Sequence, residues 1–198
     1  SPLPPYIRTR LDDADRYQTT YARGDPVSAA APTAGLHFTA ETLGALRDAG
    51  IGFCTLQLEI GLATFAPIRT RHVDEHRMHE ERFAIPVATA EMIEQTRVSG
   101  GRIVAVGTTV MRALEAAAGA TGTVTTGAGT TRLFITPGHQ FRVADALLTN
   151  FHQPRSSLLV LLAAFIGMQR WRDAYAHALD TGYRFLSLGD CMLCWRAA

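Results

Sequence analysis

The stretch Gly101-Arg-Ile-Val-Ala-Val-Gly-Thr-Thr109 decides the fold that this sequence predicts. Residues 102–106 form a short apolar run, typical of a strand that is buried on both faces of a parallel sheet. Gly107 follows this run, and the hydroxyl of Thr108 or Thr109 can cap a helix that begins there. Ligands in α/β folds gather at the carboxyl ends of such strands. We therefore expect residues 102–106 to be a central strand with a binding site beside Gly107.

Outward from this unit, strands and helices alternate along the chain. Apolar periodicity and capping residues predict helices at 12–22, 40–49, 89–99, 110–118, 156–167 and 171–179, with Thr39 and Thr89 among the caps. Strands are predicted at 51–60, 82–86, 133–136 and 145–149, with a terminal strand or hairpin over 183–195 and a flexible Gly/Thr-rich loop over 119–129. This order predicts a single α/β domain over residues 1–198, whose mostly parallel or mixed sheet is flanked by helices.

The composition is that of a folded globular protein. Hydrophobic residues make up 47% of the 198 residues and charged residues 19%. The net charge of +1 provides no general attraction to nucleic acid, although all 19 basic residues are arginines, which suit phosphate contacts. Three cysteines are too few for a disulfide framework, and Cys191 and Cys194 are expected to be buried structural thiols. The longest apolar run falls short of the ~20 residues that span a bilayer, so we expect a cytoplasmic protein without membrane contact.

Histidines in three short segments suggest an enzyme, because imidazole transfers protons readily near neutral pH. His37 and His152 follow loops, although a lone histidine is more often a structural hydrogen-bonding group. His76 and His79 stand three residues apart, with Glu81 nearby, and could hold a metal if they lay on one face of a helix. Helix capping alone could likewise explain the threonines after Gly107, although free N–H groups there, with Arg112 one turn on, would suit an anion.

In combination, these segments resemble the S-adenosylmethionine:tRNA ribosyltransferase-isomerase family of queuosine synthesis, in the order in which that family has them. The matching segments are Pro2-Leu-Pro-Pro-Tyr-Ile7, Tyr17-Gln-Thr19, Ala31-Pro-Thr-Ala-Gly-Leu-His-Phe38, Thr64-Phe65-x-Pro67, His76-x-Met-His79 with Glu81, Ala105-Val-Gly-Thr-Thr109 with Arg112 and Leu114-Glu115, Thr149-Asn-Phe-His152-x-Pro154, and Tyr183-Arg-Phe185 with Gly189-Asp190. The family is longer, and this chain looks like its C-terminal part, without the N-terminal portion of the α/β domain and the β-rich domain inserted there.

The resemblance implies that the ribosyl group of S-adenosylmethionine, the co-substrate, moves onto 7-aminomethyl-7-deazaguanine in a tRNA, without a metal. Adenine and methionine would leave, and epoxyqueuosine would remain in a tRNA bound by a monomeric enzyme. The sulfonium acidifies the C5′ hydrogens, so the reaction needs a general base and an acid. The resemblance implies catalytic roles for His37, His76, His79, Glu81 and His152. It implies substrate-binding roles for Thr33, Gly35, Thr64, Phe65, Gly107, Thr108, Thr109, Arg112, Asn150 and Ser156.

Two positions depart from the family pattern: Glu59 stands where a histidine is usual, and Ala63 where a glycine is usual. Glu59 could attract the sulfonium cation, or it could be a solvent-exposed strand end. Two other functions stay open at this point. The chain could be a non-catalytic member that binds tRNA or S-adenosylmethionine, or a metal-dependent hydrolase that uses His76, His79 and Glu81. We expect the four named histidines to converge on one cleft.

Overall fold

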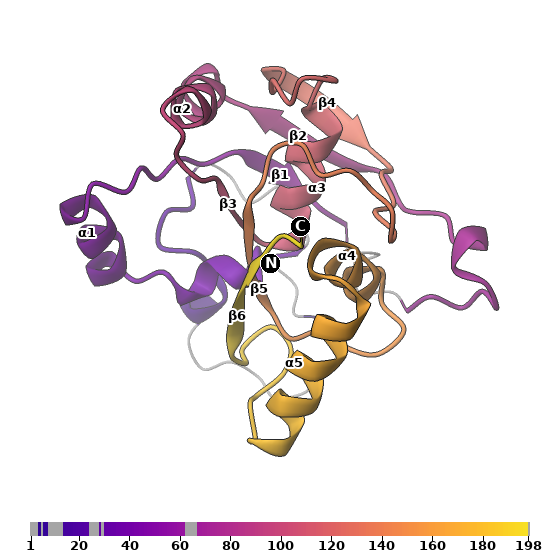
Figure 1. Ribbon diagram of the computed structural model, residues 1–198. Helices are drawn as coiled ribbons and strands as arrows, with labels where there is room; N and C mark the ends of the chain where they lie inside the picture. Colours follow the sequence, from indigo (N-terminus) through magenta and orange to yellow (C-terminus); the bar gives the residue numbers. More distant parts are fainter. Residues whose placement is uncertain are drawn as a thin grey trace.

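The protein is described by a computed structural model that covers residues 4, 6–7, 14–23, 28, 30–61 and 67–197. Strands and helices alternate in it as Figure 1 shows, and the fold is α/β. The strands form two three-stranded sheets. The first sheet holds β1 (Gln57–Glu59), β2 (Glu81–Ile85) and β4 (Gly127–Thr131), and the second holds β3 (Val104–Val106), β5 (Ala146–Asn150) and β6 (Cys191–Trp195).

Strand order corrects one expectation about the sheet. Both pairings of the first sheet are antiparallel. In the second sheet, β3 pairs with β5 in parallel and β5 pairs with β6 antiparallel, so this sheet is mixed, which is one of the two expected forms. β5 is therefore the central strand and β3 lies at an edge, with Val104 45% exposed. A short apolar run does not reveal how many neighbours its strand has, which is why residues 102–106 were expected at the centre.

The helices follow the predicted order, and two begin at the expected caps. They are α1 (Ala40–Asp48), α2 (Val87–Val98), α3 (Thr108–Ala117), α4 (Ser157–Ile166) and α5 (Met168–Asp180). The hydroxyls of Thr39 and Ser156 accept hydrogen bonds from N–H groups of the first turns of α1 and α4. α2 differs, because Pro86 precedes its first residue and the Thr89 hydroxyl donates instead to the Thr55 carbonyl at 2.7 Å. Thr89 thus joins α2 to the segment that precedes β1, and does not cap the helix.

Several weakly patterned segments differ from the prediction. The strand expected over 51–60 is confined to β1, and 133–136 forms no strand. β4 occupies part of the expected loop, because its glycines and threonines pair with all of β2. In the region 12–22, the structure has a short 3-10 helix, η1 (Ala14–Tyr17); residues 12–13 lie outside the described part. Pairing between distant segments here outweighs local propensity.

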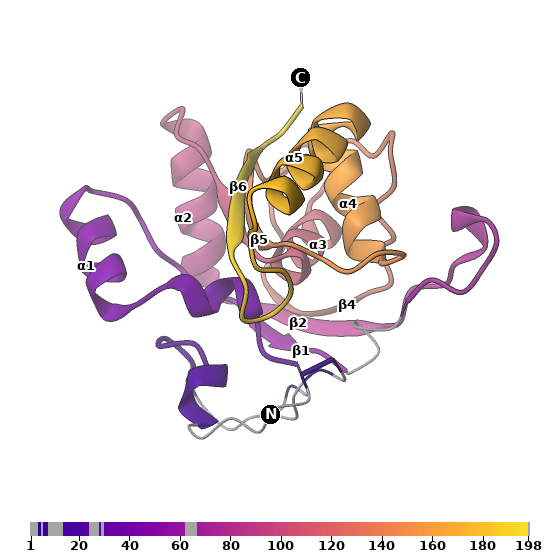
Figure 2. The same cartoon turned by 90° about the horizontal axis from the view of Figure 1, so that it is seen from below.

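The core lies on one face of the second sheet. Ala105, Leu147 and Cys194 occupy one row across β3, β5 and β6, and all three are buried. Phe165 of α4 and Met111 of α3 belong to the same core. Figure 2 shows α4 and α5 together on one side of β5 and β6. Burial raises the pKa of the Cys194 thiol to about 11, as expected for a structural cysteine. Among the described helices, none has the length and apolar character to cross a bilayer.

Candidate active site

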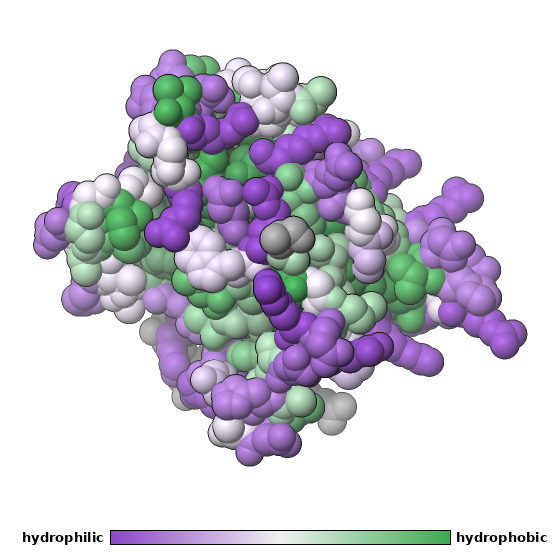
Figure 3. Space-filling view, in the orientation of Figure 1, coloured by the Kyte–Doolittle hydropathy of each residue, from purple (hydrophilic) through white to green (hydrophobic). Residues whose placement is uncertain are grey.

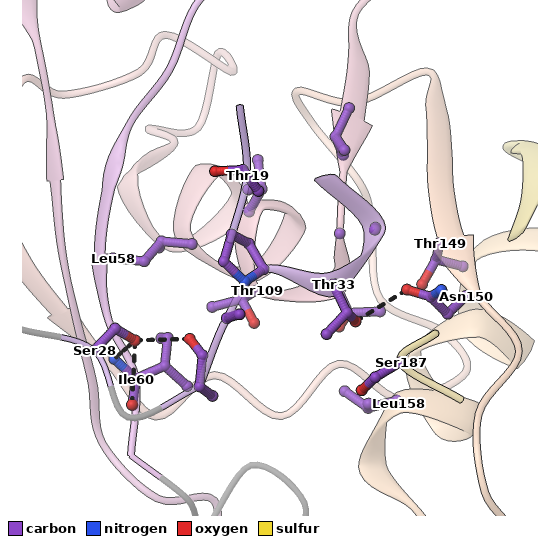
Figure 4. Close-up of a pocket in the computed structure, with 18 of the residues that line it drawn as sticks. Thr19, Ser28, Thr33, Leu58, Ile60, Thr109, Thr149, Asn150, Leu158 and Ser187 are labelled. Atoms are coloured by element: carbon purple, nitrogen blue, oxygen red, sulfur yellow. Dashed lines mark hydrogen bonds between the residues drawn. The ribbon is translucent and has the colours of Figure 1, made fainter. Parts of the chain in front are cut away.

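A pocket of about 630 Å³ lies between the two sheets, at the carboxyl ends of β3 and β5. One wall comes from β1 and its flanks, with Leu58 and Ile60, and the facing wall carries Thr149, Asn150 and Ser187 (Figure 4). Its volume is that of sites for small molecules and cofactors. The position confirms that the strand–glycine–helix unit borders a pocket, although β3 is an edge strand.

The first turn of α3 lines the pocket with Gly107, Thr108 and Thr109. Gly107 precedes the helix with a φ of +96°, a backbone conformation that favours glycine, and its N–H donates to the Leu148 carbonyl at 2.8 Å. Neither threonine side chain caps α3. The two hydroxyls, which were expected to be caps or substrate ligands, are thus not used as caps in this structure. The turn presents the positive end of the helix dipole to the pocket.

Asn150, the last residue of β5, joins this strand to the 3-10 helix η2 (Thr33–His37). The Thr33 hydroxyl donates to Asn150 Oδ1 at 3.0 Å, and Asn150 Nδ2 lies 3.2 Å from His37 Nε2. Because the amide nitrogen can only donate, His37 Nε2 is the acceptor in this contact. Thr33 and Asn150 line the pocket and His37 stands directly behind Asn150, so these three predicted residues act as one network.

His152 follows β5 and also lines the pocket. Its Nε2 lies 2.9 Å from the Thr149 hydroxyl, and its backbone N–H donates to the Tyr175 hydroxyl at 2.8 Å. Burial lowers the pKa of His152 to about 4, so the imidazole is neutral at physiological pH. An uncharged imidazole can hydrogen-bond or accept a proton without repelling a cationic ligand.

The described lining combines apolar side chains with neutral polar groups and is almost uncharged. Arg23 is its one charged side chain, and the described lining includes no carboxylate. Hydroxyl and amide groups supply the other polar contacts, among them Ser156, which also caps α4. Such a surface suits a sugar or a nucleobase, which offers neutral donors and acceptors.

Tyr21, which no sequence pattern identifies as a site residue, lies against the predicted residue Gly35. A Cβ atom on Gly35 would overlap the Tyr21 hydroxyl, so this close approach requires glycine, and Gly35 itself is not in the described lining. Tyr21 lines the pocket, as do Leu186 and Ser187 near the C-terminus. Leu186 has a φ of +71°, a strained conformation that is commonest near functional sites. No local motif signals these residues, because their positions depend on long-range packing.

Glu81 and Arg112 are buried together, away from the pocket lining. Arg112 Nη1 lies 2.7 Å from Glu81 Oε2, their side chains are 3% and 7% exposed, and Arg112 Nε donates to the Leu133 carbonyl at 3.0 Å. Burial raises the pKa of Glu81, and Arg112 and His79 partly offset that rise. The Glu81 carboxylate and the Arg112 guanidinium thus form an ion pair with each other. The expectation was that Glu81 would be catalytic and that Arg112 would bind substrate.

His76 and His79 belong to the neighbourhood of this ion pair. The His76 ring packs edge-on against Phe134 with centroids 5.3 Å apart, and burial together with His79 lowers the pKa of His76. Neither histidine is among the described lining of the pocket. Of the four predicted histidines, only His152 is thus in the described lining; His37 bonds to the lining residue Asn150, and the convergence of all four on one cleft stays a prediction.

The departures from the family pattern also lie away from the pocket or outside the described residues. Glu59 faces Arg82 across β1 and β2 at 3.8 Å, and the two side chains are 49% and 65% exposed. Its neighbours Leu58 and Ile60 line the pocket, whereas Glu59 does not. The structure thus favours a solvent-exposed strand end over a partner for the sulfonium. Thr64, Phe65 and Ala63 lie outside the described residues.

The chain is similar to known proteins over almost all of its length. The family described as "Queuosine biosynthesis protein" matches residues 1–194. A relative from Thiobacillus denitrificans is 53% identical over all of this chain, and one from Azoarcus sp. is 55% identical over 98% of it. Both are named S-adenosylmethionine:tRNA ribosyltransferase-isomerase, and the chain spans 57% and 56% of their lengths. The crystal structure of an S-adenosylmethionine tRNA ribosyltransferase from Thermotoga maritima, 39% identical, matches 81% of this chain and 50% of its own with a TM-score of 0.65.

Proposed function

The chain belongs to the queuosine biosynthesis protein family, and on this premise we propose that it transfers and isomerises the ribosyl group of S-adenosylmethionine onto 7-aminomethyl-7-deazaguanine in tRNA. Adenine and methionine leave, and epoxyqueuosine is the product. The observation that carries the proposal is the neutral, hydroxyl-rich pocket in which Asn150 and His152 meet the start of α3. Asn150 and His152 share one segment and the start of α3 belongs to another, and both segments lie within the part of the chain that matches the family.

The pocket chemistry suits a cationic donor that must lose a proton. The sulfonium acidifies the C5′ hydrogens of S-adenosylmethionine, and their removal gives an ylide that expels adenine. His152 is the one imidazole in the described lining, and its neutral state avoids repulsion of the sulfonium. The neutral ring would accept the C5′ proton on its unprotonated nitrogen, and because a pKa of about 4 makes the protonated ring a strong acid, it would give that proton to adenine as adenine leaves.

The network of Thr33, Asn150 and His37 supports a positioning role. It fixes the end of β5 against η2, so Asn150 cannot rotate without breaking two contacts. A base or sugar that lies in the pocket would then meet fixed hydroxyl and amide groups, which lowers the cost of orienting it. The pairing of Glu81 with Arg112 argues against a metal-dependent hydrolase, because a metal ion would compete with the guanidinium for that carboxylate.

Release of adenine tests the proposal. The protein is incubated with S-adenosylmethionine and a tRNA that carries 7-aminomethyl-7-deazaguanine, and adenine is measured by chromatography. We expect release that requires both substrates and that falls by about 10²–10⁴-fold in His152→Gln, the range for loss of a proton-transferring group. His177→Gln, an exposed histidine on α5, is the matched control and should retain activity. Binding of S-adenosylmethionine without adenine release would instead indicate a non-catalytic member, and equal losses in both variants would contradict the role of His152.

A further inference from the structure

His152 lies just beyond the paired part of the second sheet. The last register pair of β5 and β6 joins Asn150 to Cys191, and residues 151–156 belong to no strand or helix. The backbone groups of such a segment need partners outside the regular ladders, because an unpaired buried N–H or C=O group is costly. The position of the His152 imidazole therefore depends on the contacts that hold this segment.

The peptide group that joins Phe151 to His152 carries two of these contacts. Its carbonyl, on Phe151, accepts a hydrogen bond from the Leu186 N–H at 2.8 Å. Its N–H, on His152, donates to the Tyr175 hydroxyl at 2.8 Å. Because a peptide group is planar, hydrogen bonds at both of its ends fix its orientation, and with it the direction in which the His152 side chain leaves the backbone.

Tyr175 reaches this peptide group from outside the pocket. It belongs to α5, and no residue of that helix is in the described lining. Trp171, Tyr175 and Ala178 recur at i, i+4 and i+7, so they share the helix face that packs against the core. Hydrophilic side chains cover much of the outward side of α5, in the lower part of Figure 3. The Tyr175 hydroxyl is thus presented to the interior of the protein.

Aromatic contacts hold the Tyr175 ring in place. Its centroid lies 5.5 Å from that of Phe151 and 5.7 Å from that of Phe185, both in edge-on arrangements, and 5.9 Å from that of Trp171. These are favourable separations for aromatic pairs. Burial also raises the pKa of Tyr175, so its hydroxyl stays uncharged at physiological pH. The acceptor for the His152 N–H is therefore a fixed and neutral group.

We propose that Tyr175 is a positioning residue, which fixes the His152 imidazole in the pocket through the hydrogen bond to the His152 backbone. The proposal rests on the function proposed above, in which His152 moves a proton. The imidazole Nε2 lies 2.9 Å from the Thr149 hydroxyl, a contact that requires the ring to keep its place. A displacement of about 1 Å can lower turnover about 10²-fold, so Tyr175 affects kcat although it does not touch the substrate.

Tyr175→Phe tests this role, because it removes the hydroxyl and keeps the ring. In the adenine-release assay we expect kcat to fall by about 10–100-fold. The KM for S-adenosylmethionine should stay within about twofold of the original, since the substrate loses no contact. Hydrogen exchange, followed by NMR on the protein without substrate, should become at least about tenfold faster at the His152 amide, while the amides of β5 keep their rates.

Two variants serve as matched controls. Tyr183→Phe removes the hydroxyl of a second tyrosine that packs on Phe151, with centroids 5.5 Å apart and with Tyr183 44% exposed. It should retain kcat and the slow exchange at His152. Trp171→Phe weakens the packing around the Tyr175 ring but keeps the hydroxyl. Its melting temperature should fall, while kcat stays within about twofold of the original.

Unchanged exchange at the His152 amide in Tyr175→Phe would overturn the proposal. Losses of kcat that follow the melting temperature alike in Tyr175→Phe and Trp171→Phe would overturn it too, because the role of Tyr175 would then be structural. A failure of the proposed function gives a different result. The unsubstituted protein would release no adenine, and exchange at the His152 amide would alone decide whether Tyr175 holds His152 in place.

Discussion

The ion pair between Glu81 and Arg112 should act as a thermodynamic unit that anchors α3. Arg112 follows Thr108 by four residues, so it lies about 6 Å further along the helix than the turn that lines the pocket. Removing one partner leaves the other charge buried, which typically costs about 3–5 kcal/mol. We therefore expect Glu81→Met and Arg112→Met each to lower the free energy of unfolding by about that amount.

The double variant shows whether Glu81 and Arg112 stabilise the fold as a coupled pair or contribute independently to the free energy of unfolding. Without either charge, the main losses are the Arg112 bond to the Leu133 carbonyl and the volume of the longer side chain, together about 1–3 kcal/mol. The double variant should thus be more stable than at least one single variant. Urea denaturation followed by tryptophan fluorescence measures all four states of the cycle.

A neighbouring pair provides the control for this cycle. Glu80 and Arg132 lie 3.3 Å apart, and their side chains are 42% and 71% exposed. Methionine at either position should change stability by less than about 1 kcal/mol, because exposed ion pairs contribute little. If the Glu81 and Arg112 effects added to within about 0.5 kcal/mol, the two residues would be independent and the anchoring role of the pair would be wrong.

Three further predictions concern the pocket and its surroundings. His152 has a folded-state pKa of about 4, below its unfolded value, so its contribution to stability is present above pH 6.5 and is lost as the pH falls from 6.5 towards 4. Unfolding curves over this range should show that the free energy of unfolding falls by up to about 3 kcal/mol, and this fall should be absent in His152→Phe. Gly107→Ala should lower the free energy of unfolding by about 1–3 kcal/mol, because alanine is strained at a φ of +96°. An unchanged midpoint in thermal or urea unfolding would contradict the assigned backbone conformation. Glu59→Gln should leave calorimetric binding of S-adenosylmethionine unchanged, since Glu59 lies outside the described lining, and a selective loss for the cationic ligand would restore the charge argument.

Elements with strong local signals could be predicted from the sequence. Thr39 and Ser156 cap helices as expected, and the apolar run that contains β5 forms a strand. Asn150 and His152 likewise follow from short motifs and lie at the pocket. These features depend on residues close in sequence, where hydrogen bonding and periodicity act directly.

Features that depend on distant pairing could not be predicted in the same way. β4 carries the sequence Gly-Ala-Gly-Thr-Thr, which has little strand propensity, and forms because β2 offers it a full ladder. The prediction assigned Glu81 and Arg112 to the substrate site because both belong to motifs of the family. Their burial depends instead on the approach of β2 to α3, which no local pattern indicates. Tyr21 lines the pocket through its contact with Gly35, which no local pattern encodes.

The walls of the pocket come from segments that are far apart along the chain, from Tyr6 to Ser187. A site assembled in this way exists in the native state and vanishes when the chain unfolds. Its ligand therefore acts as a stabiliser by mass action, and a concentration of 100 times Kd adds about 2.7 kcal/mol to the free energy of unfolding. Melting curves recorded with S-adenosylmethionine, adenine or methionine will rank these molecules by affinity, even in variants that have lost turnover.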